Sequence, residues 1–98
     1  MIRVREVFQI APDKMREAKA LAREMAAYEV KMGGTAHTML TDLTGEYYRL
    51  VLESEFESLA AFETALGKAF GTEEWQRLYA PFRALIRGGS REILTVVS

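Results

Sequence analysis

The sequence predicts one α+β domain in which strands and helices follow the order β-α-β-β-α-β. Three observations lead to this fold class. The 98 residues are enough for a single hydrophobic core, so residues 1–98 are expected to form one domain. Each half of the chain holds two strand-like segments around a segment with helical spacing of its apolar residues. Glycine pairs at 33–34 and 88–89 mark the boundaries between these segments.

The first strand is predicted over Ile2–Ile10, where apolar and polar residues alternate. One face carries Ile2, Val4, Phe8 and Ile10, with Glu6 as the single polar interruption. The other face carries Arg3, Arg5, Val7 and Gln9. From Met15 to Met32 apolar side chains then recur every three or four residues, which predicts an amphipathic helix that ends at Gly33 and Gly34.

Residues Thr35–Phe56 are predicted to form a β-hairpin with a three-residue loop, Leu43–Gly45, and Gly45 in the left-handed conformation. This register pairs Met39 with Arg49 and His37 with Val51. It therefore assigns these four residues, with Thr35, Thr41, Tyr47 and Glu53, to one common and more polar face of the sheet.

The second helical region is predicted in two pieces. Ser58 is the expected N-cap of a helix that Gly71 ends, and Thr72 is the expected N-cap of the next one. The apolar stripe of the latter runs to Ile86, with Pro81 as a point where the helix should kink or split, and Gly88-Gly89 as its end. A last strand is expected over Ser90–Val97.

Right-handed crossovers place all helices on one face of a four-stranded antiparallel sheet, which is the ferredoxin-like arrangement. The other face stays open in a single chain. Along with polar groups, it is expected to carry Val7, Met39, Val51, Ile93 and Val97. A half-apolar face is unfavourable in water, so a second copy is expected to cover it and form a homodimer.

Composition excludes several functional classes. Thirteen basic residues nearly balance fourteen acidic ones, without the basic excess of nucleic-acid binders. No apolar stretch approaches the ~20 residues needed to span a bilayer. The absence of cysteine removes disulfides, thiolate nucleophiles and cysteine metal sites. With no signal-peptide pattern at the start of the sequence, a cytoplasmic location without nucleic-acid or membrane partners is expected.

The pattern resembles the dimeric α/β-barrel superfamily, and within it the NIPSNAP-like proteins. The matching segments are Thr41–Gly45, Glu55–Glu63, Glu74–Tyr79 and Gly88–Leu94. The resemblance implies a dimer of ferredoxin-like subunits with an internal cavity. It also implies a choice of functions, since such proteins include cofactor-independent monooxygenases, haem-binding or haem-degrading proteins and many without an assigned activity.

Five residues are candidates for a cavity: His37, Arg49, Glu53, Tyr47 and Trp75. His37, the single histidine, is suited to act as a base or to ligate haem, but equally to a structural hydrogen bond. Arg3, Arg5, Arg49 and Arg91, with Glu53 and Glu55, form either a face that holds an acidic or polar ligand or a lattice of cross-strand ion pairs. Tyr47 is expected to point inward, and Trp75 to close the cavity mouth or pack in the core.

No residue set identifies a catalytic site, and one histidine without cysteine predicts no metal site. The interpretation that fits these observations is a small homodimeric protein that binds a small organic ligand, without an obligatory cofactor. The alternatives are a cofactor-independent monooxygenase, a haem-binding or haem-degrading enzyme, and a structural or interaction module without a ligand.

Overall fold

The computed structural model describes residues 1–98 and confirms the predicted order of elements. The strands and helices are β1 (Ile2–Ile10), α1 (Met15–Lys31), β2 (Thr38–Thr41), β3 (Arg49–Phe56), α2 (Leu59–Phe70), α3 (Glu73–Arg83) and β4 (Ile86–Thr95). The four strands form one antiparallel sheet in the order β2-β3-β1-β4. This is the ferredoxin-like arrangement.

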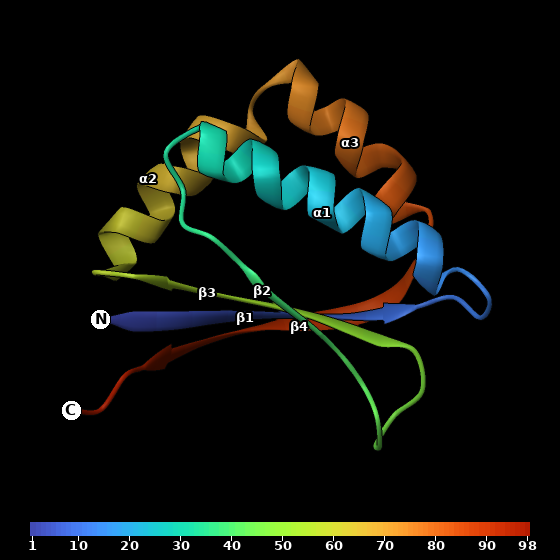
Figure 1. The fold of residues 1–98 in the computed structure, drawn as a ribbon. Coiled ribbons are helices and arrows are strands. Elements are labelled where there is room, and N and C mark those ends of the chain that lie inside the picture. Colours follow the sequence, from blue (N-terminus) through green and yellow to red (C-terminus); the bar gives the residue numbers. More distant parts are fainter.

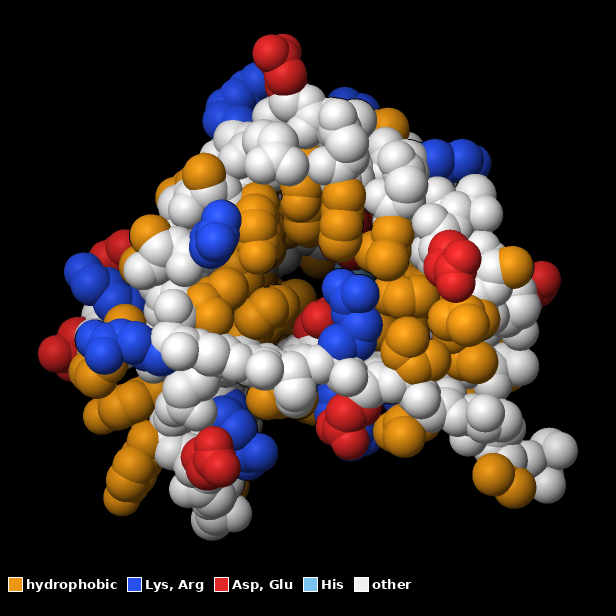
Figure 2. Space-filling view, turned by 180° about the vertical axis from the view of Figure 1, so that it is seen from behind, with side chains coloured by type: hydrophobic (Ala, Val, Ile, Leu, Met, Phe, Trp, Pro, Cys, Tyr) orange, Lys and Arg blue, Asp and Glu red, His pale blue; other side chains and the backbone are white.

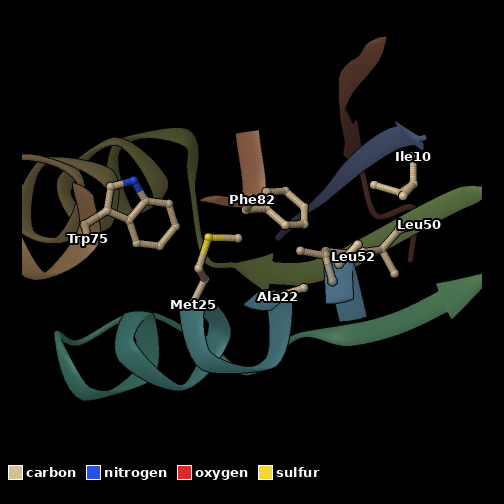
Figure 3. Packing of buried hydrophobic residues seen from close by; sticks show 8 residues of the cluster. Ile10, Ala22, Met25, Leu50, Leu52, Trp75 and Phe82 are labelled. Atoms are coloured by element: carbon tan, nitrogen blue, oxygen red, sulfur yellow. The ribbon is translucent and has the colours of Figure 1, made fainter. Parts of the chain in front are cut away.

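All three helices lie on one side of the sheet, and the other side is uncovered (Figure 1). The core between the two layers is formed by buried side chains from β1, β3, α1 and α3. Figure 3 shows Met25 of α1 pointing toward the space between Trp75 and Phe82 of α3. No helix combines the length and the apolar character that crossing a bilayer requires.

The helix N-caps agree with the sequence. The hydroxyl of Ser58 accepts a hydrogen bond from the backbone of Ala61 at 3.1 Å, and Thr72 accepts one from Trp75 at 3.2 Å. These bonds satisfy amide groups that have no partner within the helix. Pro81 lies inside α3, which ends two residues later, at Arg83, instead of continuing to Ile86.

The central strands have the predicted faces. Val4 and Ile10 of β1, like Leu50, Leu52 and Ser54 of β3, are buried toward the helices. On the open face, a row of apolar residues crosses three strands, with Leu40 opposite Val51 and Val51 opposite Val7. A neighbouring row holds Glu53, Arg5 and Glu92.

The ion pairs of the open face link adjacent strands. Arg5 Nε lies 2.7 Å from Glu53, and Arg3 pairs with Glu55. The hydrogen bond and charge of Glu55 raise the pKa of the Arg3 guanidinium above its ordinary value, and Glu53 does the same for Arg5. The Arg3–Glu55 pair is nearly half-exposed and the Arg5–Glu53 pair is partly buried. Because both pairs still reach solvent in the single chain, each adds little to its stability.

The predicted register of the β2–β3 hairpin is wrong by three residues. Thr38 pairs with Glu53 and Leu40 with Val51, so Met39 and His37 face the helices, not the open side. The turn is longer than expected and occupies residues 42–48. Gly45 has a positive φ of 103° as predicted, but Tyr48 is also left-handed, at 65°. Asp42 stabilises this longer turn by accepting a hydrogen bond from the backbone of Arg49 at 2.6 Å.

Strand β4 begins at Ile86, four residues before the predicted start at Ser90. Gly88 and Gly89 do not end a helix but lie within the strand, opposite Gln9 and Phe8. A Cβ at Gly89 would overlap the carbonyl oxygen of Val7, so glycine permits the close approach of β4 to β1. Because Ile93 pairs with Val4 and Arg91 with Glu6, both face the helices, contrary to the prediction.

Candidate functional site

A cavity of about 410 Å³ lies between the sheet and the helices. Thirteen of the 19 residues that line it are hydrophobic, which makes its surface mainly apolar. Figure 2 looks into a hollow in the molecule whose walls are mostly hydrophobic, with basic and acidic atoms visible inside. Cavities of this size and character are the usual binding places for small organic molecules.

Aromatic side chains form much of the wall. Trp75 stacks on Phe70, with ring centroids 4.4 Å apart, and on Tyr79 at 6.0 Å. Phe82 meets Phe8 edge to face at 5.1 Å. All five of these residues line the cavity. Since α2 and α3 contribute Phe70, Trp75 and Tyr79 as one stack, the cavity offers flat aromatic surface to a ligand.

The first polar group in the cavity is an ion pair between Arg91 of β4 and Glu6 of β1. The two residues are directly opposite each other in the strand ladder. Arg91 Nε donates to Glu6 Oε1, and the guanidinium carbon lies 5.4 Å from the centre of the Phe62 ring. Glu6 and Phe62 therefore hold the Arg91 guanidinium at the cavity wall.

The second polar group is formed by His37 and Glu29. His37 directly precedes β2, and Glu29 belongs to the last turn of α1. The imidazole Nε2 lies 2.9 Å from Glu29 Oε2, and the histidine side chain is only 10% exposed. His37 Nδ1 is buried without a hydrogen-bond partner. Both residues line the cavity, so a carboxylate and an imidazole form an acid–base pair at its β2 side.

Of the five residues that the sequence singled out, His37 and Trp75 line this cavity. The other three lie elsewhere. Glu53 is paired with Arg5 on the open face, and Tyr47 is 76% exposed in the hairpin turn beside Tyr48. The Arg49 side chain folds over the turn, where its Nη2 atom would be 2.8 Å from a Cβ at Gly45.

Sequence reasoning missed Glu6 and Glu29 as cavity residues, and it assigned Arg91 to the open face instead of the helix side. The sequence pattern could have identified Glu6, because this residue interrupts the apolar face of the first strand. The indication for Glu29 was weaker: it continues the spacing of Ala18, Ala22 and Met25 along the buried side of α1. The sequence did single out Arg91, but its position depends on the face that β4 turns to the helices, and this face was assigned wrongly.

The residues present do not fit a haem ligated by His37. Axial ligation requires a free imidazole nitrogen, but Nε2 lies beside Glu29 and Nδ1 is buried within the protein. No three histidine, aspartate or glutamate side chains gather in an arrangement that could hold a metal ion. The side chains of the cavity themselves offer hydrogen bonding, aromatic stacking and proton transfer.

Comparison with known proteins gives one family. The family model described as NIPSNAP matches residues 4–98. An uncharacterized NIPSNAP domain protein from Burkholderia xenovorans is similar in structure, with a TM-score of 0.89, 10% identity and coverage of 100% of this chain and 96% of that chain. A NIPSNAP family protein from Agrobacterium tumefaciens has a TM-score of 0.86 and 21% identity over 98% of this chain and 85% of that chain.

The fold extends beyond that family. A mutant form of SnoaB, a cofactor-independent oxygenase from Streptomyces nogalater, has a TM-score of 0.75 and 17% identity over 99% of this chain and 93% of that chain. At this level of identity the likeness shows a common fold alone. The sequence matches no curated protein.

Proposed function

This chain belongs to the NIPSNAP family, and from that premise we propose that it binds a small aromatic molecule in the cavity between its sheet and its helices. The observation that carries the proposal is the 410 Å³ cavity with its mainly apolar lining. A well-packed domain of this size leaves few voids larger than a water molecule. An open space of these dimensions, walled by stacked aromatic rings, therefore supports ligand binding over a purely structural role.

The functional unit in this proposal is a homodimer. The open face carries the apolar row Leu40, Val51 and Val7 beside a row of neutralised ion pairs. Leu40 and Leu94 are both more than two-fifths exposed in the single subunit. A second copy would cover these residues through the same face, which is the self-complementary pairing of a twofold dimer.

A cofactor-independent oxygenase is the second candidate function. It is favoured by the fold shared with SnoaB and by the pair of His37 and Glu29 beside an aromatic-lined cavity. Oxygenation without a cofactor requires a substrate that becomes electron-rich once it loses a proton, and an acid–base pair can accept that proton. Oxygen uptake with dihydroxynaphthalene as substrate, measured for the purified protein and for His37→Ala, tests this candidate.

Trp75 gives a direct test of ligand binding because it is the only tryptophan of the chain and lines the cavity. We expect dihydroxynaphthalene to quench its fluorescence in a saturable way. Ala65→Phe, which places a ring in the cavity from α2, is the matched variant and should abolish the saturable component. Quenching that is linear in concentration and equal in both proteins would show collision only and would contradict the proposal.

A further inference from the structure

The acidic and basic groups of the cavity indicate what kind of ligand it accepts, on the premise that it binds one. Each carboxylate in the cavity is held by one basic partner through one oxygen: Glu6 through Oε1 by Arg91, and Glu29 through Oε2 by His37. A carboxylate has two oxygens and about four acceptor positions. These contacts therefore leave the second oxygen of each, Glu6 Oε2 and Glu29 Oε1, for a further donor.

The two pairs border the cavity on the same face of the sheet, toward its two opposite edges. His37 precedes the edge strand β2, and Arg91 lies in the other edge strand, β4. Three strand spacings separate their backbones, which corresponds to roughly 14 Å. The rest of the cavity lining is mainly hydrophobic and includes the Trp75 stack. A flat ligand on this surface would meet a polar pair at each end and apolar contacts along its length.

The charges in the cavity oppose an anionic ligand. Two carboxylates face one guanidinium, so the four groups carry one negative charge when His37 is neutral and none when it is protonated. Arg91, the only arginine or lysine that lines the cavity, already donates to Glu6. An added carboxylate or phosphate would lie near two negative charges, with a single, already paired guanidinium to offset them.

From this arrangement we infer that the cavity selects an uncharged aromatic ligand with hydroxyl groups, which donate hydrogen bonds to Glu29 and Glu6. The basic partners fix the positions of the two carboxylates. The aromatic stack supplies contact area but no selectivity for polar groups. Selection thus depends on donors at the ends of the ligand and excludes carboxylates of the same shape.

Three matched probes test the inference: 2-naphthol, 2-methoxynaphthalene and 2-naphthoate. They share one ring system and present a donor, an acceptor without a donor, and an anion. By Trp75 fluorescence or calorimetry, 2-naphthol should bind about tenfold more tightly than 2-methoxynaphthalene, as expected for a hydrogen bond to a charged group. Binding of 2-naphthoate should be weaker than that of 2-methoxynaphthalene.

Two variants identify the acceptors. Glu29→Gln and Glu6→Gln keep the side-chain size but remove the charge, so at least one should reduce the preference for 2-naphthol over its methyl ether several-fold. Glu24→Gln is the matched control, because Glu24 is an exposed residue of the same helix as Glu29. This substitution should leave the preference unchanged. Thermal unfolding of each variant confirms that it is folded.

The outcomes separate this inference from the proposed function. Binding of 2-naphthoate as tight as that of 2-naphthol would overturn the selection of donors while ligand binding itself still stands. A preference for 2-naphthol that persists in both glutamine variants would do the same. Absence of binding by all three probes would contradict the proposed function and this inference with it.

Discussion

Glu29 fixes both the side chain of His37 and the backbone just before it. The imidazole Nε2 lies 2.9 Å from the Glu29 carboxylate, and the amide of Gly34 donates to the Glu29 carbonyl at 2.8 Å. A Cβ at Gly34 would lie only 2.9 Å from that carbonyl oxygen. The end of α1 and the approach to β2 are therefore joined at one residue, and the β2 side of the cavity depends on this joint.

Replacement of His37 by alanine should lower the free energy of unfolding by about 1–2 kcal/mol, because it leaves the largely buried Glu29 carboxylate without its partner. Urea unfolding measures this change. The double variant with Glu29→Gln should regain part of the loss, since the unpaired charge is then removed. If the effects of the two substitutions on the free energy of unfolding simply added, the interaction between His37 and Glu29 would contribute nothing to stability.

Gly89 and Gly67 should respond to alanine in opposite directions. At Gly89 the new methyl group would overlap the Val7 carbonyl oxygen and force β4 away from β1, so a clear loss of stability is expected. Gly67 is exposed in α2, and its Cβ would meet nothing within 4 Å. Alanine there should raise stability by about 0.5–1 kcal/mol through helix propensity. Melting temperatures of the two variants, compared with the unmodified chain, check both signs.

Phe82→Ala should be among the most damaging substitutions in the chain, with an expected loss of about 3–5 kcal/mol. Phe82 is fully buried and meets Phe8 edge to face. Leu43→Ala is the control, because Leu43 is 99% exposed at the hairpin tip and should change stability by less than about 0.5 kcal/mol. Similar unfolding midpoints for both variants would show that the core is not centred on Phe82.

Val51→Asp should convert the proposed dimer into a monomer. Val51 lies in the middle of the open face, between Leu40 and Val7, and a twofold interface would bring the new carboxylate close to its own copy. Light scattering coupled to size exclusion gives the mass of each form. Val30→Asp, an equal change at an exposed position of α1, should leave the dimer intact. A monomeric unmodified chain at micromolar concentration would refute the dimer itself.

The sequence predicts the fold well where one signal dominates. Ser58 and Thr72 cap their helices as expected, because a hydroxyl before an apolar helical stripe has one favourable use. The faces of β1 and β3 are correct because only one face of each strand is apolar enough to be buried. These features are local, and they determine the order of elements and the position of both layers.

Strands without one dominant signal were assigned wrongly. β2 contains only Thr38–Thr41, which is too short for its alternation to select a register against the turn. β4 has apolar and charged residues on both faces, so Ile93 and Arg91 can be assigned to either side until its pairing with β1 is known. These wrong assignments affected the candidate site most, because His37 and Arg91 come from these two edges of the sheet.

The same short edge strand has an evolutionary consequence. Only four residues of β2 pair with the sheet, while His37 lies just before them and is held by a side-chain contact to α1. Substitutions at residues 35–37 can therefore reshape the β2 wall without breaking the ladder of the three longer strands. A domain built in this way can acquire a new ligand preference through a few changes at one border, at a small cost to the rest of its architecture.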